Sequence, residues 1–436
     1  MSKKKRLIGL LYIAVLCSQG LCAQTRQMGI EELFRLADEQ SKSIQTYRTG
    51  AESAEEALKA AKAQRLPDVN VSLSASYWGN GKWDRDFGNA MTVDMPHFGN
   101  NFALEAQQVI YAGGAISSGI KQAEIGKALA ELDLQKNVQE IRFLLVGHYL
   151  NVYKLDNQIR VVQKNMELIE EVIANMKARR EQGTVLKNDI TRYELQKEQL
   201  NLQLSRVEDA RKIANHQLVT ALHLPEGTEI SPDTYLLERQ ILTLTEDDWQ
   251  DMAETNNILL KQTQAAIQMN EQKVKQERSE RLPHISIVAA EHLDGPITIE
   301  VPVLDNNFNY WYIGIGVKYN LSSLFKNNKK LKQARLNVRQ AQELHQLAQE
   351  QVENAVQEGY VNFLTAFTDL RTQKNSVKLA DENYNVTENR YKNEMALLTD
   401  MLDASNMKLT ADLGLVNTRI NILYNYYKMK YITHTL

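Results

Sequence analysis

Apolar residues recur along the chain with two different periods, and each period predicts a different element. From Leu134 to Met176, thirteen apolar positions cover 42 residues in twelve steps, a mean spacing of 3.5. This spacing keeps one seam of a helix against a partner and is typical of left-handed coiled coils. We therefore expect a very long helix over about 115–180 that packs side by side with other helices.

Four shorter segments alternate apolar and polar residues with a period of two. The clearest run is Val69 to Tyr77, in which asparagine or serine separates the apolar residues. We expect strands at about 68–78, 101–111, 283–291 and 310–321. Each has about ten residues, the length of a tilted strand that crosses an outer membrane. A small soluble sheet that caps the helices would show the same period.

The two faces of these strands differ in a way that suits lipid on one side and water on the other. We expect the apolar face to carry Val71, Leu73, Ile313 and Ile315, and the water-facing side to carry Ser72, Ser74 and Gly314. Aromatic residues gather at the strand ends and loops, as in the girdles of membrane barrels. They are Trp78, Trp83, Phe87, Phe98, Phe308, Tyr310, Trp311 and Tyr312.

The chain contains the same unit twice. Leu66-Pro67 and Leu282-Pro283 open corresponding strands 216 residues apart, and Arg179 and Arg390 lie 211 apart, as do Asp189 and Asp400. Each copy consists of a helix, two strands, a very long helix and a shorter helix. The helices are expected at 31–64, 115–180 and 185–222, and again at 247–280, 327–392 and 396–432. We therefore place repeat 1 at 24–225 and repeat 2 at 226–436; such duplication is typical of structures built around an axis.

The N-terminus has the form of a secretory signal. Lys3-Lys4-Lys5-Arg6 precedes an apolar run from Leu7 to Leu16, and Ala23 provides a small residue for cleavage. We expect residues 1–23 to be a signal peptide. Its removal takes away four positive charges and changes the formal net charge from -3 to -7. It also removes the two cysteines, Cys17 and Cys22, so the exported chain is expected to have no thiol chemistry.

Composition and motifs argue against an enzyme. The chain has 7 prolines in 436 residues, and residues 97–224 and 303–436 contain none, which disfavours a doubly wound α/β fold or an all-β sandwich. The small net charge gives no reason to expect nucleic acid. None of the eight histidines forms a metal-binding spacing, and neither a phosphate loop nor a nucleophile elbow is present. We expect no catalytic residue, no metal and no cofactor.

Four strands in one chain cannot close a membrane barrel. Every strand edge in lipid must be paired, and bacterial barrels begin at about eight strands. Two, three or four copies would supply 8, 12 or 16 strands. The membrane interpretation therefore predicts a homo-oligomer.

The signal peptide, the two copies, the Leu-Pro entry to each first strand and the break before each Leu-x-x-Asp helix resemble the TolC-like outer membrane efflux proteins. The resemblance implies a mainly α fold: a homotrimer with a 12-stranded β-barrel in outer-membrane lipid and a long coiled-coil α-barrel of 12 helices across the periplasm. It implies the passive exit channel of a tripartite drug-efflux pump or type I secretion system in a Gram-negative-type bacterium. The expected partners are a periplasmic adaptor (membrane fusion) protein and an inner-membrane pump of RND or ABC type. A periplasmic adaptor and a structural coiled-coil protein are the alternatives.

The resemblance also assigns roles to the turns before the two shorter helices. Asp400 and Asp403 match paired acidic rings at the periplasmic entrance, with Asp189 as the counterpart of Asp400, and Tyr391 matches a tyrosine that helps hold the entrance shut. The expected adaptor-docking residues of the turns are Gly183, Leu186, Leu397 and Leu398. Two departures stand out: Glu394 replaces a usual glycine, and Ala396 lies where an arginine can occur. Asp400 can equally be an ordinary helix cap, and both roles stay open.

Overall fold

The computed structural model describes residues 25–84, 88, 90–233, 241, 244–297, 303–393 and 395–436. The predicted signal peptide, 1–23, lies outside these residues, as does Glu394. The described chain is mainly helical, and none of its helices is long and apolar enough to span a membrane. It divides into two compact units, each of which draws on both halves of the sequence.

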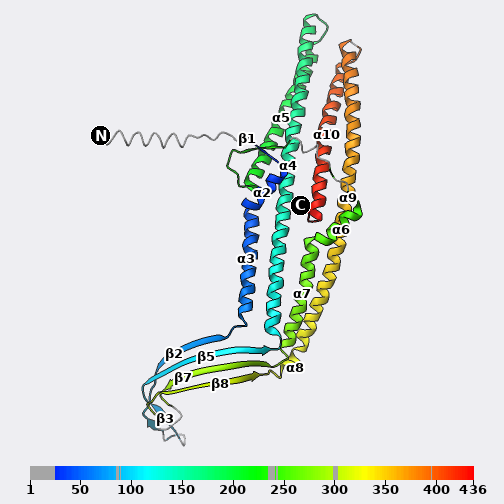
Figure 1. Cartoon of the computed structure of the whole chain (residues 1–436). Helices are drawn as coiled ribbons and strands as arrows, with labels where there is room; N and C mark the ends of the chain where they lie inside the picture. The colour runs from blue at the N-terminus through cyan, green and yellow to red at the C-terminus, as the bar shows by residue number, and fades with distance from the viewer. Residues whose placement is uncertain are drawn as a thin grey trace, which may run out of the picture. The chain divides into compact units, whose positions relative to one another are not determined.

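The first unit comprises the described residues within 1–48, 133–260 and 348–436. It contains two antiparallel helical hairpins, which Figure 1 shows in green and in orange to red. Hairpin 1 joins the second part of α4 (Ala115–Glu181) to α5 (Lys187–Ala221), and hairpin 2 joins the second part of α9 (Asn328–Lys392) to α10 (Leu398–Ile432). The shorter helices α2 (Ile30–Gln40) and α6 (Glu246–Asn256) pack beside them.

The apolar stripe predicted on α4 faces the core of this unit. All thirteen of its residues are buried or half-buried. Leu145, Tyr149 and Val152 are completely buried in a cluster with residues of α2, α5 and α10. Val162 to Met176 continue the stripe into a second cluster, which includes Tyr193 and Met401. A spacing of 3.5 in the sequence thus corresponds to a continuous packing seam.

Two short strands that the sequence pattern did not reveal lie near the starts of the two predicted repeats. β1 (Thr25–Met28) pairs in parallel with β6 (Glu229–Pro232). The buried Tyr149 hydroxyl donates to the carbonyl of Met28 at 2.7 Å and accepts from the N–H of Asp233 at 2.9 Å. Each strand has only four residues, which is too short for a periodic signal.

The second unit, Thr49–Leu132 and Lys261–Leu347, contains an antiparallel sheet of four strands in the order β2-β5-β7-β8. Figure 1 shows these strands side by side. Their bounds are β2 (Asp68–Tyr77), β5 (Phe98–Ala112), β7 (His284–Gly295) and β8 (Phe308–Lys318). A small hairpin of β3 (Gly81–Trp83) and β4 (Met91–Val93) lies in the loop between β2 and β5.

The strand register separates an apolar face from a polar face. Val71 pairs with Leu104 and Leu73 with Phe102, while Ile313 pairs with Ala289 and Ile315 with Ile287. These pairs lie on one face because residues directly opposite each other in an antiparallel sheet share a face. Ser72, Ser74 and Gly314 lie on the other. Leu73 is 79% exposed and Ile315 is 73% exposed, so the apolar face is uncovered in the single chain.

The sheet joins the helices of the second unit through tight turns. These helices are α3 (Lys42–Ala63) and α7 (Ile258–Ser279), which both begin in the first unit, together with α8 (Ser323–Lys326) and the first parts of α4 and α9. Gly113, between β5 and α4, has a φ of 61°, and a Cβ there would lie 2.7 Å from the carbonyl oxygen of Ser279. Both the backbone angle and the close approach therefore require glycine.

The helices expected at 31–64 and 247–280 are each two helices. The first breaks at Ser41 between α2 and α3, and the second breaks at Asn257 between α6 and α7. Ser41 Oγ accepts from the N–H of Ile44 at 3.5 Å, and Asn257 Oδ1 accepts from the N–H of Leu259 at 2.9 Å. Both residues act as N-caps of the following helix, a position that favours serine and asparagine.

Candidate functional site

The ends of the two hairpins carry the residues assigned from sequence. In hairpin 1, Gly183 has a φ of 77°, and the N–H of Thr184 donates to the carbonyl of Arg179 at 3.1 Å. In hairpin 2, the N–H of Met395 donates to the carbonyl of Arg390 at 2.8 Å. The same hydrogen bond therefore closes both turns, at positions 211 residues apart.

Asp400 caps the start of α10. Its Oδ2 accepts from the backbone N–H of Leu397 at 3.0 Å, and the side chain is exposed. A carboxylate in the first turn of a helix also complements the helix dipole. Asp400 therefore acts as a helix cap, as the sequence allowed. Oδ2 makes this hydrogen bond, and Oδ1 takes no part in it.

Asp403 and Asp189 lie in different surroundings. Asp403 is exposed and lines an open groove between α9 and α10, together with Leu379, Asn383 and Met407. Asp189 is half-buried in the first turn of α5, and its carboxylate contributes to the raised pKa of Tyr391. The structure thus brings Asp189, but not Asp403, near the tyrosine.

The leucines of the turns divide into exposed and buried residues. Leu186 is 71% exposed and Leu397 is 70% exposed, at equivalent positions of the two turns, and Gly183 is exposed beside Leu186. Leu398 is only 8% exposed and belongs to the core cluster of Tyr193 and Met401. Its side chain packs the hairpins together, so the exposed surface of the turns is formed without it.

Tyr391 connects the two hairpins. The guanidinium carbon of Arg179, in the last turn of α4, lies 5.8 Å from the centre of its ring, within the range of a cation–π contact. Burial raises the pKa of Tyr391, the Arg179 charge lowers it, and the Asp189 carboxylate raises it. The cation beside this tyrosine therefore comes from the other hairpin, whereas sequence reasoning looked for an arginine at position 396.

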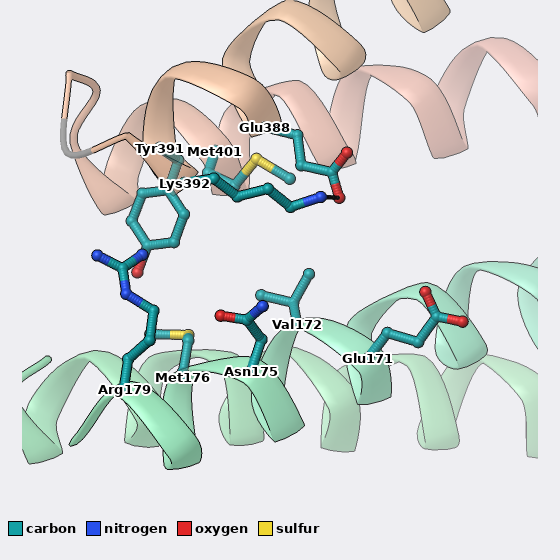
Figure 2. Close-up of a pocket in the computed structure, with 9 residues that line it drawn as sticks. All are labelled: Glu171, Val172, Asn175, Met176, Arg179, Glu388, Tyr391, Lys392 and Met401. Carbon is teal, nitrogen blue, oxygen red and sulfur yellow. Dashed lines mark ion pairs between the residues drawn. The ribbon is translucent and has the colours of Figure 1, made fainter. Parts of the chain in front are cut away.

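A cavity of about 120 Å³ lies beside this contact, between the hairpins (Figure 2). Glu388 and Lys392 of α9 form an ion pair at 3.1 Å on one side of it, and Arg179 stands next to Tyr391. The remaining lining residues are Glu171, Val172, Asn175 and Met176 of α4 and Met401 of α10. The hairpins thus meet through a few specific contacts around an incompletely filled space.

Two further tyrosines surround this junction. Burial raises the pKa of Tyr384 to about 12, and the Glu388 and Glu171 carboxylates add to the shift. Tyr193 is 1% exposed, and its hydroxyl has no hydrogen-bond partner among the described residues. Burial raises its pKa as well. The hydroxyls of Tyr384 and Tyr193 therefore stay neutral at ordinary pH.

Among the described residues, no cluster of three or more His, Cys, Asp or Glu could hold a metal ion.

A comparison with protein-family models identifies one family, and a search of solved structures finds chains of the same fold. A sequence model described as outer membrane efflux protein matches residues 33–222 and 249–426. The outer membrane protein VceC of Vibrio cholerae has a TM-score of 0.76 at 14% identity, over 93% of this chain and 96% of that chain. The Campylobacter jejuni CmeC outer membrane channel has a TM-score of 0.74 at 15% identity, over 93% and 85%.

A third similar structure is the open state of the Neisseria gonorrhoeae MtrE outer membrane channel. Its TM-score is 0.72 at 13% identity, over 93% of this chain and 88% of that chain. At these identities the likeness shows the fold. Comparison with curated protein sequences gives no significant match.

Proposed function

The chain belongs to the outer membrane efflux protein family, and on that premise we propose that it is the homotrimeric exit channel of a tripartite efflux pump or type I secretion system. The family consists of passive outer membrane channels rather than enzymes. In the proposed trimer, three sheets form a 12-stranded β-barrel in the membrane, and the hairpins form a 12-helix α-barrel. The two copies of the repeat, 24–225 and 226–436, each supply two strands and one hairpin.

The observation that carries the proposal is the four-stranded sheet with two open edges. Among the described residues, β2 and β8 each pair with one strand, so each leaves one edge open. All ten residues of β2 are exposed. An unpaired backbone N–H or C=O in hydrocarbon costs several kcal/mol, so such edges are not stable in lipid. Pairing β8 of one chain with β2 of the next removes every edge when the ring closes.

The apolar face has the composition of a lipid-facing surface. Near the loop ends of the strands, this face carries Tyr77, its partner Phe98, and Trp311. Closer to the helices, it carries mainly aliphatic residues. Trp311 is 75% exposed and Tyr77 is 81% exposed. Aromatic side chains at the interface and aliphatic ones at mid-depth are the pattern of outer-membrane barrels. This order supports a membrane-spanning sheet over a soluble cap.

The hairpin ends are the proposed periplasmic entrance. Three chains would bring Asp400 and Asp403 together as acidic rings, in addition to the cap that Asp400 makes. The contact between Arg179 and Tyr391, near Asp189, would hold the two hairpins of each chain together in the resting state. Separating the hairpins would break this contact and widen the entrance.

The exposed turns are the proposed docking surface for a periplasmic adaptor. Leu186 and Leu397 present apolar side chains, and Gly183 lets the first turn approach a partner closely. An inner-membrane pump of RND or ABC type would deliver the substrate through that adaptor. The family match disfavours the alternatives of an adaptor or a structural coiled-coil protein.

Cysteine cross-linking across the proposed β2–β8 contact tests the trimer. The sequence has only Cys17 and Cys22, both in the predicted signal peptide, so introduced cysteines have a clean background. Ser72→Cys on β2 is combined in turn with Tyr312→Cys, Gly314→Cys or Gly316→Cys on β8, which lie on the same polar face. Oxidation in isolated membranes should link the chains into covalent dimers and trimers for the pair that is in register.

The single variants Ser72→Cys and Gly314→Cys are the matched controls and should not give covalent trimers. Native mass measurement of the purified protein gives an independent count of chains. A protein that is monomeric by mass and forms no ladder with any of the pairs would contradict the proposed barrel.

A further inference from the structure

A row of stacked aromatic rings lies on the polar face of the sheet, near its loop end. His292 of β7 lies between Tyr310 and Tyr312 of β8, with ring centres 5.1 Å and 6.2 Å away and ring planes within 15° of parallel. Phe308 extends the row beyond Tyr310 at 5.5 Å. We call these four residues the ring strip. The register places them on the face opposite Trp311.

Two carboxylates border the ring strip on the same face. Glu105 of β5 has its Oε1 4.0 Å from Nε2 of His292. Asp294 accepts from the Tyr310 hydroxyl at 3.3 Å and from the amide of Asn101. The strip therefore combines the electron-rich faces of aromatic rings with fixed negative charge.

The ring strip offers its outer members to solvent and keeps its centre covered. The His292 side chain is 15% exposed, whereas Tyr312 is 48% exposed and Phe308 is 55% exposed. β2 forms the opposite edge of the sheet. After Asp68, its polar face carries only Asn70, Ser72, Ser74 and Ser76. Pairing of β8 with another copy of β2 would therefore place small side chains beside the rings and leave them accessible.

We propose that the ring strip, with Glu105 and Asp294, is a contact site for planar aromatic cations inside the barrel. This inference rests on the proposed function, because only barrel closure turns the polar face into the wall of a channel. A cation is attracted to the face of an aromatic ring, and a flat cation can also stack on it. Three copies would line the channel with six carboxylates, three from Glu105 and three from Asp294, which attract cations and repel anions.

The site would act on solutes that leave through the barrel. Weak, repeated contacts near the outer end favour entry of planar cations into the last part of the path without holding them there. Methyl viologen, a flat organic dication, is a suitable probe because it carries both features that the site recognises. Its binding to the purified trimer can be measured by equilibrium dialysis, with zwitterionic detergent alone as the blank, whether or not the entrance is open.

Two variants remove one feature of the site each. Glu105→Gln removes a carboxylate, and Tyr310→Leu removes a ring; each should weaken methyl viologen binding by about two- to fivefold. Tyr310→Phe keeps the ring and should restore most of the binding. The matched control is Glu291→Gln, because Glu291 follows Ala290, the register partner of Glu105, and lies on the apolar face. It should bind the probe like the unmodified protein.

The outcomes separate this inference from the proposed function. Native mass measurement of the unmodified protein and of each variant reports whether the trimer forms. If the unmodified protein is a monomer, the exit-channel proposal is overturned together with the site that depends on it. A trimer that binds no methyl viologen overturns the inference alone. So does a trimer in which Glu291→Gln weakens binding as much as Glu105→Gln does.

Discussion

Ile313 and Gly314 are neighbours on β8 that face opposite sides of the sheet, so an arginine at each position tests the assignment of the faces. Ile313 pairs with Ala289 on the apolar face and is 68% exposed in the single chain. Gly314 pairs with Val288 on the polar face. A Cβ at Gly314 meets no atom of the same chain within 4 Å, so the first atom of a side chain causes no clash there. The main difference between the two substitutions is therefore the face on which the arginine lies.

The expected difference in stability is large. An arginine on the lipid face near mid-membrane costs about 2–4 kcal/mol, because its guanidinium loses water and gains no partner. Gly314→Arg keeps the charge in water and removes a glycine, which in a strand is less stable than alanine by roughly 0.5–1 kcal/mol. Ile313→Arg should therefore shift the unfolding equilibrium by roughly 30- to 1000-fold per chain, and Gly314→Arg should change it little.

Urea titration of the protein refolded into lipid vesicles measures the free energy of unfolding, and gel mobility without heating reports the oligomer. Ile313→Arg should lower the midpoint or prevent assembly, whereas Gly314→Arg should assemble normally. Equal losses for the two variants would refute the reasoning, since the register would then not separate a lipid face from a water face. A larger loss for Gly314→Arg would reverse the assignment.

Three further predictions concern the helical unit. Tyr149→Phe removes the hydroxyl that bonds the Met28 carbonyl and the Asp233 N–H, and it should lower the free energy of unfolding by about 1–3 kcal/mol. Burial raises the pKa of Tyr149 to about 12 from an ordinary value near 10, so the unmodified protein should lose stability as pH rises from 10 to 12 in urea titrations, and the variant should lose less. Asp400→Asn with Asp403→Asn should reduce cation preference and multivalent-cation block in single-channel recordings while the trimer persists; unchanged selectivity with lower thermal stability would leave only the cap role. Tyr391→Leu removes the cation–π contact with Arg179 and should raise the resting open probability by about two- to fivefold, whereas Tyr391→Phe should not; equal opening in both variants would contradict a role for the ring.

The sequence predicted the long elements well because their signals are periodic. The α4 stripe extends over many turns, and its residues face the core as the spacing of 3.5 requires. The breaks at Ser41 and Asn257 were missed, although both are N-cap residues and lie 216 apart, the offset of the two copies in this region. Comparing cap residues between the copies would have located them.

The aromatic residues near the strand ends were grouped too simply. Tyr310, Trp311 and Tyr312 are adjacent in the sequence and were all expected in a membrane girdle. In the sheet, Trp311 lies on the apolar face, while its two neighbours lie on the polar face with His292. Consecutive residues of a strand point to opposite sides, so position along the chain alone does not assign a girdle.

The hairpin junction shows why pairs distant in sequence escape this kind of reasoning. Arg179 and Tyr391 are separated by 212 residues, and neither has an unusual local pattern. Arg390 occupies the position that corresponds to Arg179, 211 residues later. It instead donates to the carbonyl of Met395 within its own turn, at 3.2 Å. Two arginines at matching positions of the predicted repeats thus make different contacts: Arg179 lies beside a tyrosine of the other hairpin, and Arg390 bonds within its own turn.

The two units differ in how much of their packing one chain supplies. The described residues of the first unit form three buried apolar clusters, built around α4, Tyr193 and Trp249. In the described part of the second unit, the buried cluster consists of Val274, Leu331 and Ala334, and the apolar face of the sheet is open. Burial of apolar surface is the main favourable term in folding. The helical unit can therefore obtain this term within one chain. In the proposed trimer, the sheet would obtain it from lipid and from neighbouring chains, so barrel closure would be linked to arrival at the membrane.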